Sequence, residues 1–152
     1  MTMNIHFICR GNVLRSLIAE TYLRSLKLDN INVISSGTNV DWSNPAEREY
    51  FSNTLDLLGR HDIKSYVGKD HAEQLTRARS QDQDITVCMN QRVVDEAEAI
   101  IELPKNVISW GIVDIGEGHR TVKDNREQYE EEIYKEITNK VDDLVLLYGL
   151  RQ

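Results

Sequence analysis

The sequence predicts an α/β fold in which a four-stranded parallel sheet is covered by helices on both faces. Short apolar segments alternate along the chain with longer segments whose apolar residues recur near a 3.6-residue period. This alternation is typical of parallel strands joined by right-handed helical crossovers. The chain has 152 residues and shows no linker, repeat or low-complexity segment. We therefore expect a single domain over residues 1–152.

The expected strands and helices can be placed by residue number. The strands are expected at 3–8, 31–35, 85–89 and 107–110. The helices are expected at 16–28, 45–59, 91–99 and 125–147, with Asn44 capping the second and Pro45 in its first turn. A turn is expected at 36–38. Residues 60–83 are polar and show no clear period, and a short helix over 71–79 is the only element expected there.

Composition restricts the class of protein. The hydrophobic fraction of 40% and the charged fraction of 28% are ordinary for a soluble globular domain. The net charge of −7 argues against a nucleic-acid-binding face. No apolar run approaches the ~20 residues of a membrane span, and no signal peptide is visible. The expectation is a protein that acts neither on nucleic acid nor in a membrane.

The cysteines and histidines point to a reduced protein without a metal. Two cysteines, Cys9 and Cys88, do not make a disulfide framework, so a cytoplasmic location is expected. A disulfide between them is the disfavoured alternative. The four histidines show no metal-ligand spacing.

The segment Cys9–Ser16 follows the first expected strand and opens the first expected helix. The residues between Cys9 and Arg15 can wrap so that their backbone N–H groups point inward and bind an anion. The helix adds its N-terminal dipole, and Arg15 adds a planar fork for two phosphate oxygens. This positive environment favours the thiolate of Cys9, to which Ser16 could donate its hydroxyl. The segment predicts an oxyanion site, and a structural cysteine before an ordinary helix is the alternative.

Two further features support this site. Gly11 would relieve the tight backbone, and Asn12 tolerates left-handed geometry and can hold the loop through its amide. A glycine-punctuated loop over 111–118 follows the fourth expected strand and carries Asp114. Because the carboxyl ends of parallel strands meet at one edge of a sheet, Asp114 is expected to meet the cysteine loop. An aspartate in a surface turn is the alternative.

These motifs resemble those of the low-molecular-weight protein tyrosine phosphatases. Residues 7–20 are similar to the family's phosphate-binding loop, V/I-C-x-G-N-x-C-R-S-P-x-A-E. Residues 35–38 are similar to its S-A-G-T segment, residues 84–90 to its D-x-I-x-x-M-D strand, and residues 110–115 to its W-x-I-x-D-P segment. The resemblance covers nearly the whole chain. It implies the three-layer, flavodoxin-like fold of phosphotyrosine phosphatase I.

The resemblance also implies a reaction. Cys9 would attack the phosphorus of a phosphotyrosine in a protein substrate, while Arg15 and the loop N–H groups hold the equatorial oxygens. Asp114 would protonate the leaving phenolate and then activate the water that hydrolyses the cysteinyl-phosphate. No metal or organic cofactor is implied. The remaining loop residues implied in phosphate binding are Arg10, Gly11, Asn12, Val13, Leu14 and Ser16.

The sequence departs from the family pattern at several positions. Leu14 replaces the usual second cysteine, so an oxidised Cys9 would have no neighbouring resolving thiol. Ile115 replaces the proline that follows the general acid. Arg10 adds a cation at the mouth of the expected phosphate-binding site. Its side chain could favour acidic substrates or simply lie in solvent.

Two positions bear on the substrate. Val13 stands where phosphotyrosine-directed members of the family carry a β-branched apolar residue and phosphoarginine-directed members carry threonine, so it indicates tyrosine. Trp42 lies in the loop that forms a wall of the substrate cleft in the family. It could stack on a phenyl ring, or it could be a partly buried loop residue.

Two other functions stay open. A thiol-linked arsenate reductase on the same fold is disfavoured, because that reaction needs two further cysteines and only Cys88 is present. A non-catalytic module that binds phosphate or phosphopeptides is the alternative of another class. For the phosphatase, a phosphotyrosine protein is the expected partner, and a monomer or weak dimer is the expected state.

Overall fold

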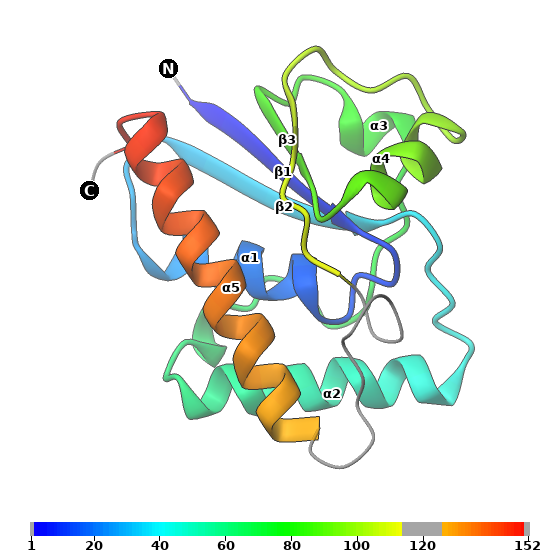
Figure 1. Ribbon diagram of the computed structural model, residues 1–152, viewed down its shortest axis with the longest axis vertical. Helices are drawn as coiled ribbons and strands as arrows, with labels where there is room; N and C mark the ends of the chain where they lie inside the picture. The colour runs from blue at the N-terminus through cyan, green and yellow to red at the C-terminus, as the bar shows by residue number, and fades with distance from the viewer. Residues whose placement is uncertain (1, 114–125, 151–152) are drawn as a thin grey trace.

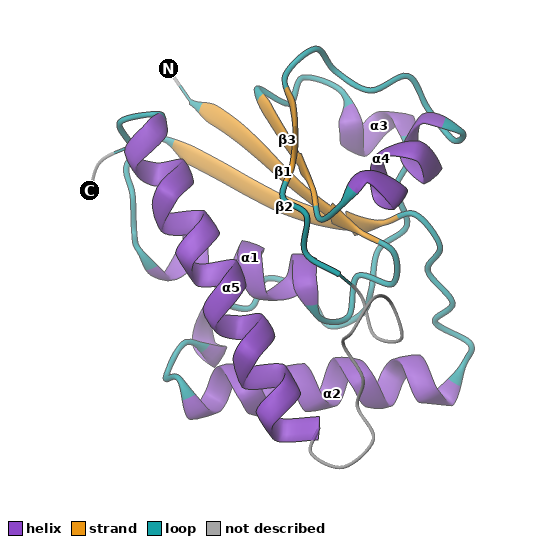
Figure 2. Ribbon diagram, viewed as in Figure 1, coloured by secondary structure: helices purple, strands orange, loops and turns teal. Residues whose placement is uncertain are grey.

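The sheet contains four parallel strands in the order β2-β1-β3-β4. Figure 2 shows the strands together, with β1, β2 and β3 labelled. The computed structural model describes residues 2–113 and 126–150. The strands are β1 (Met3–Cys9), β2 (Ile31–Gly37), β3 (Ile85–Cys88) and β4 (Val107–Ser109). The predicted α/β class and four-stranded parallel sheet are therefore confirmed.

Helices cover both faces of the sheet, which confirms the predicted layers. The helices are α1 (Arg15–Ser25), α2 (Pro45–Arg60), α3 (Arg77–Ser80), α4 (Gln91–Glu98) and α5 (Arg126–Leu147). Figure 1 shows α1 and α5 on one face of the sheet and α3 and α4 on the other. Helix α2 packs against α1 and α5, farther from the sheet. The pocket described below is lined by residues of the loop after β1, of α2 and of α5.

The core follows from the apolar pattern of each element. In β1, every side chain from Ile5 to Cys9 is buried, because this central strand is covered on both faces. In α5, the buried side chains recur at a helical period. They include Tyr129, Ile133, Ile137, Val141 and Leu144. The buried side chains of α2 are Phe51, Thr54, Leu57 and Leu58.

Several element boundaries differ from the prediction. Helix α1 ends at Ser25 rather than at residue 28, and Lys27 then turns the chain with a φ of 54°. The expected turn at 36–38 is wrong, because β2 continues through Gly37 and pairs with the end of β1. Strand β4 ends at Ser109. The 60–83 segment contains a 3-10 turn, η1 (Lys64–Tyr66). The short helix expected over 71–79 is replaced by α3, which covers only Arg77–Ser80.

The start of α2 agrees with the prediction. Pro45 lies in the first turn, where its missing N–H is no loss. The side chain of Asn44 accepts a hydrogen bond from the Ala46 N–H at 3.0 Å. This cap fixes where α2 begins, and α2 in turn forms one wall of the pocket described below.

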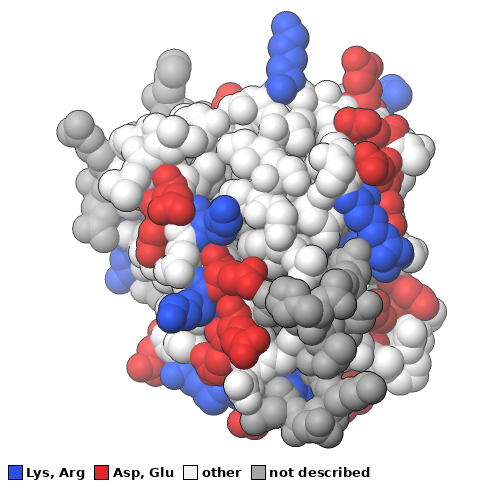
Figure 3. All heavy atoms as spheres, viewed as in Figure 1, with Lys and Arg blue, Asp and Glu red and all other residues white. Residues whose placement is uncertain are grey.

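The surface mixes charges of both signs. On the face drawn in Figure 3, basic side chains lie next to acidic ones, and they do not form one continuous basic surface. Among the described residues, no helix is both long enough and apolar enough to cross a bilayer.

Candidate active site

Cys9 is the last residue of β1, and its thiol is held by two neighbours. The Sγ atom lies 2.9 Å from the Ser16 hydroxyl oxygen and accepts a hydrogen bond from the Asn12 N–H at 3.2 Å. The side chain is 2% exposed. Both contacts come from the loop that sequence analysis predicted. They can stabilise a thiolate, because each can direct a hydrogen at the sulfur.

Asn12 fixes the shape of this loop. Its φ of 57° lies in the left-handed region, which asparagine tolerates better than most residues. Its side-chain amide donates to the Ser16 hydroxyl at 2.7 Å and to the Ser35 hydroxyl at 2.9 Å. Its side-chain carbonyl accepts from the Glu73 N–H at 2.9 Å. The role expected for Asn12 in holding the loop therefore agrees with these contacts.

Arg15 begins α1 and is buried beside the cysteine loop. Its side chain is 2% exposed, and its Nη1 donates to the Ile112 carbonyl at 2.9 Å. The N-cap residue is Leu14, which has no side-chain acceptor for the first N–H groups of the helix. A bound anion can take that place, and the helix dipole favours its negative charge.

The end of β2 and the residues after it support the Cys9 loop through backbone hydrogen bonds. The N–H groups of Thr38 and Asn39 donate to the carbonyls of Cys9 and Arg10, both at 2.9 Å. A Cβ at Gly37 would lie 2.5 Å from the Arg10 carbonyl oxygen. The two segments can approach this closely only because Gly37 has no side chain. Residues 36–38 therefore support the cysteine loop, and two of them belong to β2.

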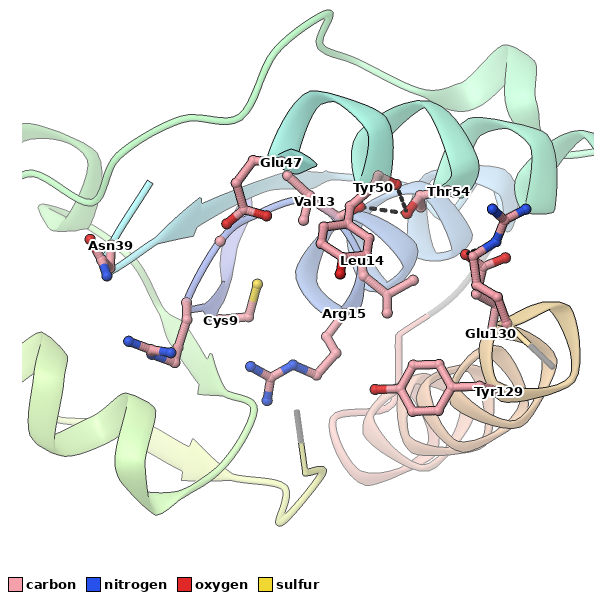
Figure 4. Close-up of a pocket in the computed structure, with 13 residues that line it drawn as sticks. Cys9, Val13, Leu14, Arg15, Asn39, Glu47, Tyr50, Thr54, Tyr129 and Glu130 are labelled. Atoms are coloured by element: carbon pink, nitrogen blue, oxygen red, sulfur yellow. Dashed lines mark hydrogen bonds and ion pairs between the residues drawn. The ribbon is translucent and has the colours of Figure 1, made fainter. Parts of the chain in front are cut away.

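A pocket of about 210 Å³ opens above the loop. Figure 4 shows the Cys9 thiol and the Arg15 guanidinium facing this space, with Tyr50 and Tyr129 on its other side. The Thr54 hydroxyl donates to the Val13 carbonyl at 2.5 Å and so ties α2 to the loop. The lining comes from the loop, from α2 and from α5. Its residues are Cys9, Arg10, Gly11, Val13, Leu14, Arg15, Asn39, Glu47, Tyr50, Thr54, Arg126, Tyr129 and Glu130.

The residues contributed by α2 and α5 were missed at the sequence level. Glu47, Tyr50 and Thr54 follow the three- and four-residue spacing of one helix face. That spacing could have placed them together. It could not have shown that this face meets Cys9, because the meeting depends on how α2 packs against α1 and α5.

The structure does not bring Trp42 to the pocket. Its ring packs edge-on against Phe51, with centroids 5.2 Å apart, and lies 6.2 Å from the His71 ring. It lines a separate cavity together with Arg48 and Lys64. Tyr50 and Tyr129 are the aromatic residues that line the Cys9 pocket among the described residues.

Arg10 lines the pocket but is already paired. Its Nε lies 3.0 Å from each carboxylate oxygen of Glu96 in α4. Glu96 also accepts from the Thr38 hydroxyl at 2.8 Å. The Arg10 side chain therefore ties the loop to α4, and its charge is partly offset at the pocket mouth.

Asp114 lies outside the described residues, but the chain reaches the site just before it. The Ile112 carbonyl accepts from Arg15 and also from the Asn90 side chain at 3.1 Å. On the far side of the undescribed segment, Arg126 lines the pocket. Thus Arg126 lines the pocket, and Ile112 contacts Arg15, which also lines it.

The second cysteine is remote from this chemistry. Cys88 is a free thiol that is completely buried at the end of β3. Burial raises the pKa of its thiol to about 12, which disfavours the nucleophilic thiolate. Within residues 2–113 and 126–150, no group of His, Cys, Asp or Glu side chains is arranged to hold a metal ion.

The sequence around this site matches a known protein family. Residues 4–147 match the family described as low molecular weight phosphotyrosine protein phosphatase. The chain belongs to this family. It is therefore an enzyme of the cysteine-dependent phosphatase class, and the family resemblance found in the sequence is confirmed. A comparison with curated proteins finds no significant match.

Solved structures share the phosphatase fold. The tyrosine phosphatase AmsI of Erwinia amylovora is 19% identical with a TM-score of 0.73, and the match covers 97% of this chain and 93% of that one. The YwlE arginine phosphatase of Bacillus subtilis is 20% identical with a TM-score of 0.67, covering 93% and 95% of the two chains. A thioredoxin-dependent arsenate reductase of Corynebacterium glutamicum is 20% identical with a TM-score of 0.65, covering 94% and 60%.

Proposed function

We propose that this phosphatase hydrolyses phosphotyrosine in protein substrates through a cysteinyl-phosphate on Cys9. The observation that carries the proposal is the arrangement at the end of β1. There the Cys9 thiol, the Asn12 N–H and the Ser16 hydroxyl meet beside the buried Arg15 at the start of α1. A phosphate placed over this loop would lie against a nucleophile, backbone donors and a guanidinium.

In the first step, the Cys9 sulfur attacks phosphorus, and the bond from phosphorus to the tyrosine oxygen breaks. Arg15 and the loop N–H groups hold the equatorial oxygens, on which negative charge is spread in the transition state. Asp114 gives its proton to the leaving phenolate. In the second step, Asp114 takes a proton from water, which attacks phosphorus and releases Cys9. The position of Ile112 against Arg15 supports this role for Asp114.

The lining of the pocket supports an aromatic substrate. Val13, Leu14 and the rings of Tyr50 and Tyr129 line the pocket, and Figure 4 shows Val13 and Leu14 beside Tyr50. A phenyl ring can pack against such surfaces. The arginine phosphatase among the similar structures makes phosphoarginine the natural comparison substrate for a test.

The arsenate reductase alternative receives less support. That reaction passes a disulfide between cysteines, and the chain offers Cys88 alone as a partner for Cys9. Cys88 is buried, and the raised pKa of its thiol keeps it protonated. The proposed phosphatase reaction needs one reactive cysteine.

Charge and cysteine content support the expected partner and location of the protein. The net charge of −7 and the mixed charges in Figure 3 support a protein partner rather than nucleic acid. Cysteines that are free in the structure support a reducing, cytoplasmic location. We keep a monomer or weak dimer as part of the proposal.

The proposal is tested by assaying wild-type protein, Cys9→Ser and Asp114→Asn on p-nitrophenyl phosphate, on a phosphotyrosine peptide and on phosphoarginine. Cys9→Ser should be inactive, because the serine hydroxyl is a far weaker nucleophile than a thiolate. Asp114→Asn should lose about 10²- to 10⁴-fold in kcat. The phosphotyrosine peptide, a phosphate ester, should be preferred over phosphoarginine, in which phosphorus is bonded to nitrogen.

Three outcomes would contradict the proposal. Activity that survives in Cys9→Ser would exclude the cysteinyl-phosphate. Preference for phosphoarginine would overturn the substrate assignment. A folded wild-type protein that binds vanadate without hydrolysing any of the three compounds would indicate the non-catalytic module instead.

A further inference from the structure

A buried lysine contacts the cysteine loop from outside the pocket. The Lys69 ammonium donates to the Asn12 side-chain carbonyl at 3.0 Å and to the Ser35 carbonyl and hydroxyl oxygens, both at 2.8 Å. Its side chain is only 4% exposed. Lys69 does not line the Cys9 pocket, so it cannot touch a substrate there. Lysine is almost never buried to this extent unless it is paired, so a buried Lys69 points to a role inside the fold.

The contacts of Lys69 fit a charged side chain. Its nitrogen meets three acceptors, because Ser35 gives its own hydroxyl hydrogen to Glu20 at 2.6 Å and accepts from Lys69. A neutral amine has two N–H groups, whereas an ammonium has three. Burial, the largest effect, and Arg79 hold the pKa of Lys69 below its usual value, although the neighbouring Glu20 and Glu73 carboxylates act in the opposite direction. Three acceptors and two nearby carboxylates around one nitrogen fit the ammonium form.

The charges around Lys69 do not cancel. Glu20 lies 3.5 Å and Glu73 3.4 Å from the Lys69 nitrogen. Each carboxylate has a second cation, since Arg24 pairs with Glu20 at 3.1 Å and Arg79 with Glu73 at 2.6 Å. The cluster thus holds three cations and two carboxylates, which leaves one net positive charge.

The remaining charged groups near the cluster do not remove this excess. His6 lies beside it on β1 and is neutral, because burial, Arg79 and Lys69 lower its pKa to about 3. On the loop side, the buried Arg15 adds positive charge, and Arg10 is paired with Glu96. Glu47 lines the pocket beside Gly11, where its Oε1 atom would lie 3.3 Å from a Cβ, so its charge opposes that of the cluster at the loop and is the same in both variants tested below.

Asn12, whose side-chain carbonyl accepts from Lys69, reaches the Cys9 sulfur in two ways. In one, the Asn12 backbone N–H donates to Sγ at 3.2 Å. In the other, the Asn12 amide donates to the Ser16 hydroxyl at 2.7 Å, which lies 2.9 Å from Sγ. A cation on the Asn12 carbonyl oxygen polarises the amide and strengthens the hydrogen bonds that its NH₂ group donates.

We propose that Lys69 is a positioning residue for the reaction, and that its buried charge holds Asn12 in place and favours the thiolate form of Cys9. This inference rests on the proposed role of Cys9 as nucleophile. Lys69 acts through Asn12 and never contacts the phosphate. Glu73 has the opposite electrostatic effect, because it offsets part of the same charge.

The test measures how fast Cys9 reacts with iodoacetamide as a function of pH, in wild-type protein, Lys69→Met and Glu73→Gln. Alkylation reports the thiolate fraction and requires no turnover. Lys69→Met should shift the midpoint of the profile upward by about one pH unit, because a positive charge is lost. Glu73→Gln should shift it downward, because a negative charge is lost. The buried Cys88 should stay unlabelled, and Cys9→Ser provides the blank.

The opposite directions separate this proposal from a purely structural role, which would move both profiles the same way or neither. Thermal unfolding by circular dichroism checks that each variant is folded. Glu73 is partly exposed, so Glu73→Gln carries the test even if Lys69→Met does not fold. An unchanged profile in folded Lys69→Met, or an upward shift in Glu73→Gln, would overturn the proposal.

The same proteins are then assayed on p-nitrophenyl phosphate. At pH values below both alkylation midpoints, the kcat/KM of Lys69→Met should fall about tenfold, in proportion to the lost thiolate. A wild-type protein with no hydrolysis but with the predicted alkylation shifts would refute the proposed function and leave the role of Lys69 intact. Hydrolysis with unshifted profiles would refute the role of Lys69 alone.

Discussion

At the residue scale, Asn12 links the shape of the loop to the protonation state of the Cys9 thiol. Its left-handed backbone turns its own N–H toward the Cys9 sulfur, and its side chain reaches Ser16, Ser35 and Lys69. A glycine could adopt the same φ but would make none of the side-chain contacts. This explains why asparagine, rather than the more permissive glycine, stands at this position.

Gly37 is the second residue on which the loop geometry depends. Gly37→Ala should lower the free energy of unfolding by about 1–3 kcal/mol, because the new Cβ would lie 2.5 Å from the Arg10 carbonyl oxygen and 3.0 Å from the Asn12 nitrogen. The same displacement should lower kcat. Urea denaturation and the p-nitrophenyl phosphate assay measure the two effects.

Gly59→Ala is the matched control for this substitution. Gly59 lies in α2, and the nearest atom to a new Cβ there is the Lys64 side chain at 3.8 Å. Alanine should be neutral or stabilising by about 0.5–1 kcal/mol, since it favours the helix. If Gly37→Ala proved as stable as Gly59→Ala, the close approach of β2 to the loop would be wrong.

At the element scale, α2 supplies an aromatic wall that the sequence pattern assigned to the preceding loop. Tyr50→Ala should raise KM for a phosphotyrosine peptide about three- to tenfold with a smaller change in kcat, because the ring contacts the bound substrate in both ground and transition states. Steady-state kinetics measures both constants. Trp42→Ala should raise KM less, since Trp42 packs on Phe51 outside the pocket. The reverse order would restore Trp42 as the wall.

The segment from η1 (Lys64–Tyr66) to α3 shows where sequence reasoning stops. Its polar residues give no period, so neither the elements nor the partners could be predicted from local pattern. Lys69 and Glu73 meet Asn12, which lies 57 and 61 positions earlier in the chain. Contacts of this range depend on the complete fold. The Cys9 loop could be predicted because its parts are neighbours in sequence.

At the scale of the whole molecule, the order of strands and helices could be predicted because alternation and apolar period are local properties. The sheet order β2-β1-β3-β4 also agrees with right-handed crossovers. The boundaries could not be predicted to the residue. Gly37, for example, extends β2 because it pairs with Cys9 on a neighbouring strand, which no turn preference reveals.

The whole molecule should also lose stability in mild acid through His6. Its imidazole is buried in β1, and the pKa is lowered from 6.5 to about 3. Between these two values the unfolded chain binds a proton that the folded chain does not, so the free energy of unfolding falls as the pH falls. The contribution of His6 should reach about 1.4 kcal/mol per pH unit.

Urea denaturation at several pH values measures this dependence. His6→Asn removes the titrating group, so its stability should fall less steeply than that of the wild type between pH 6.5 and about 3. Equal slopes for the two proteins would show that His6 is protonated in the folded state. The buried environment assigned to β1 would then be wrong.

The most direct test of the central claim is to look for the phosphoryl group on Cys9 itself. Wild-type protein mixed with p-nitrophenyl phosphate is quenched in acid within the first turnover, digested, and examined by mass spectrometry. The account predicts one added phosphoryl group on the peptide that contains Cys9, and none in Cys9→Ser. Turnover of the substrate with an unmodified Cys9 peptide at every quench time, or a phosphoryl group on another residue, would contradict it.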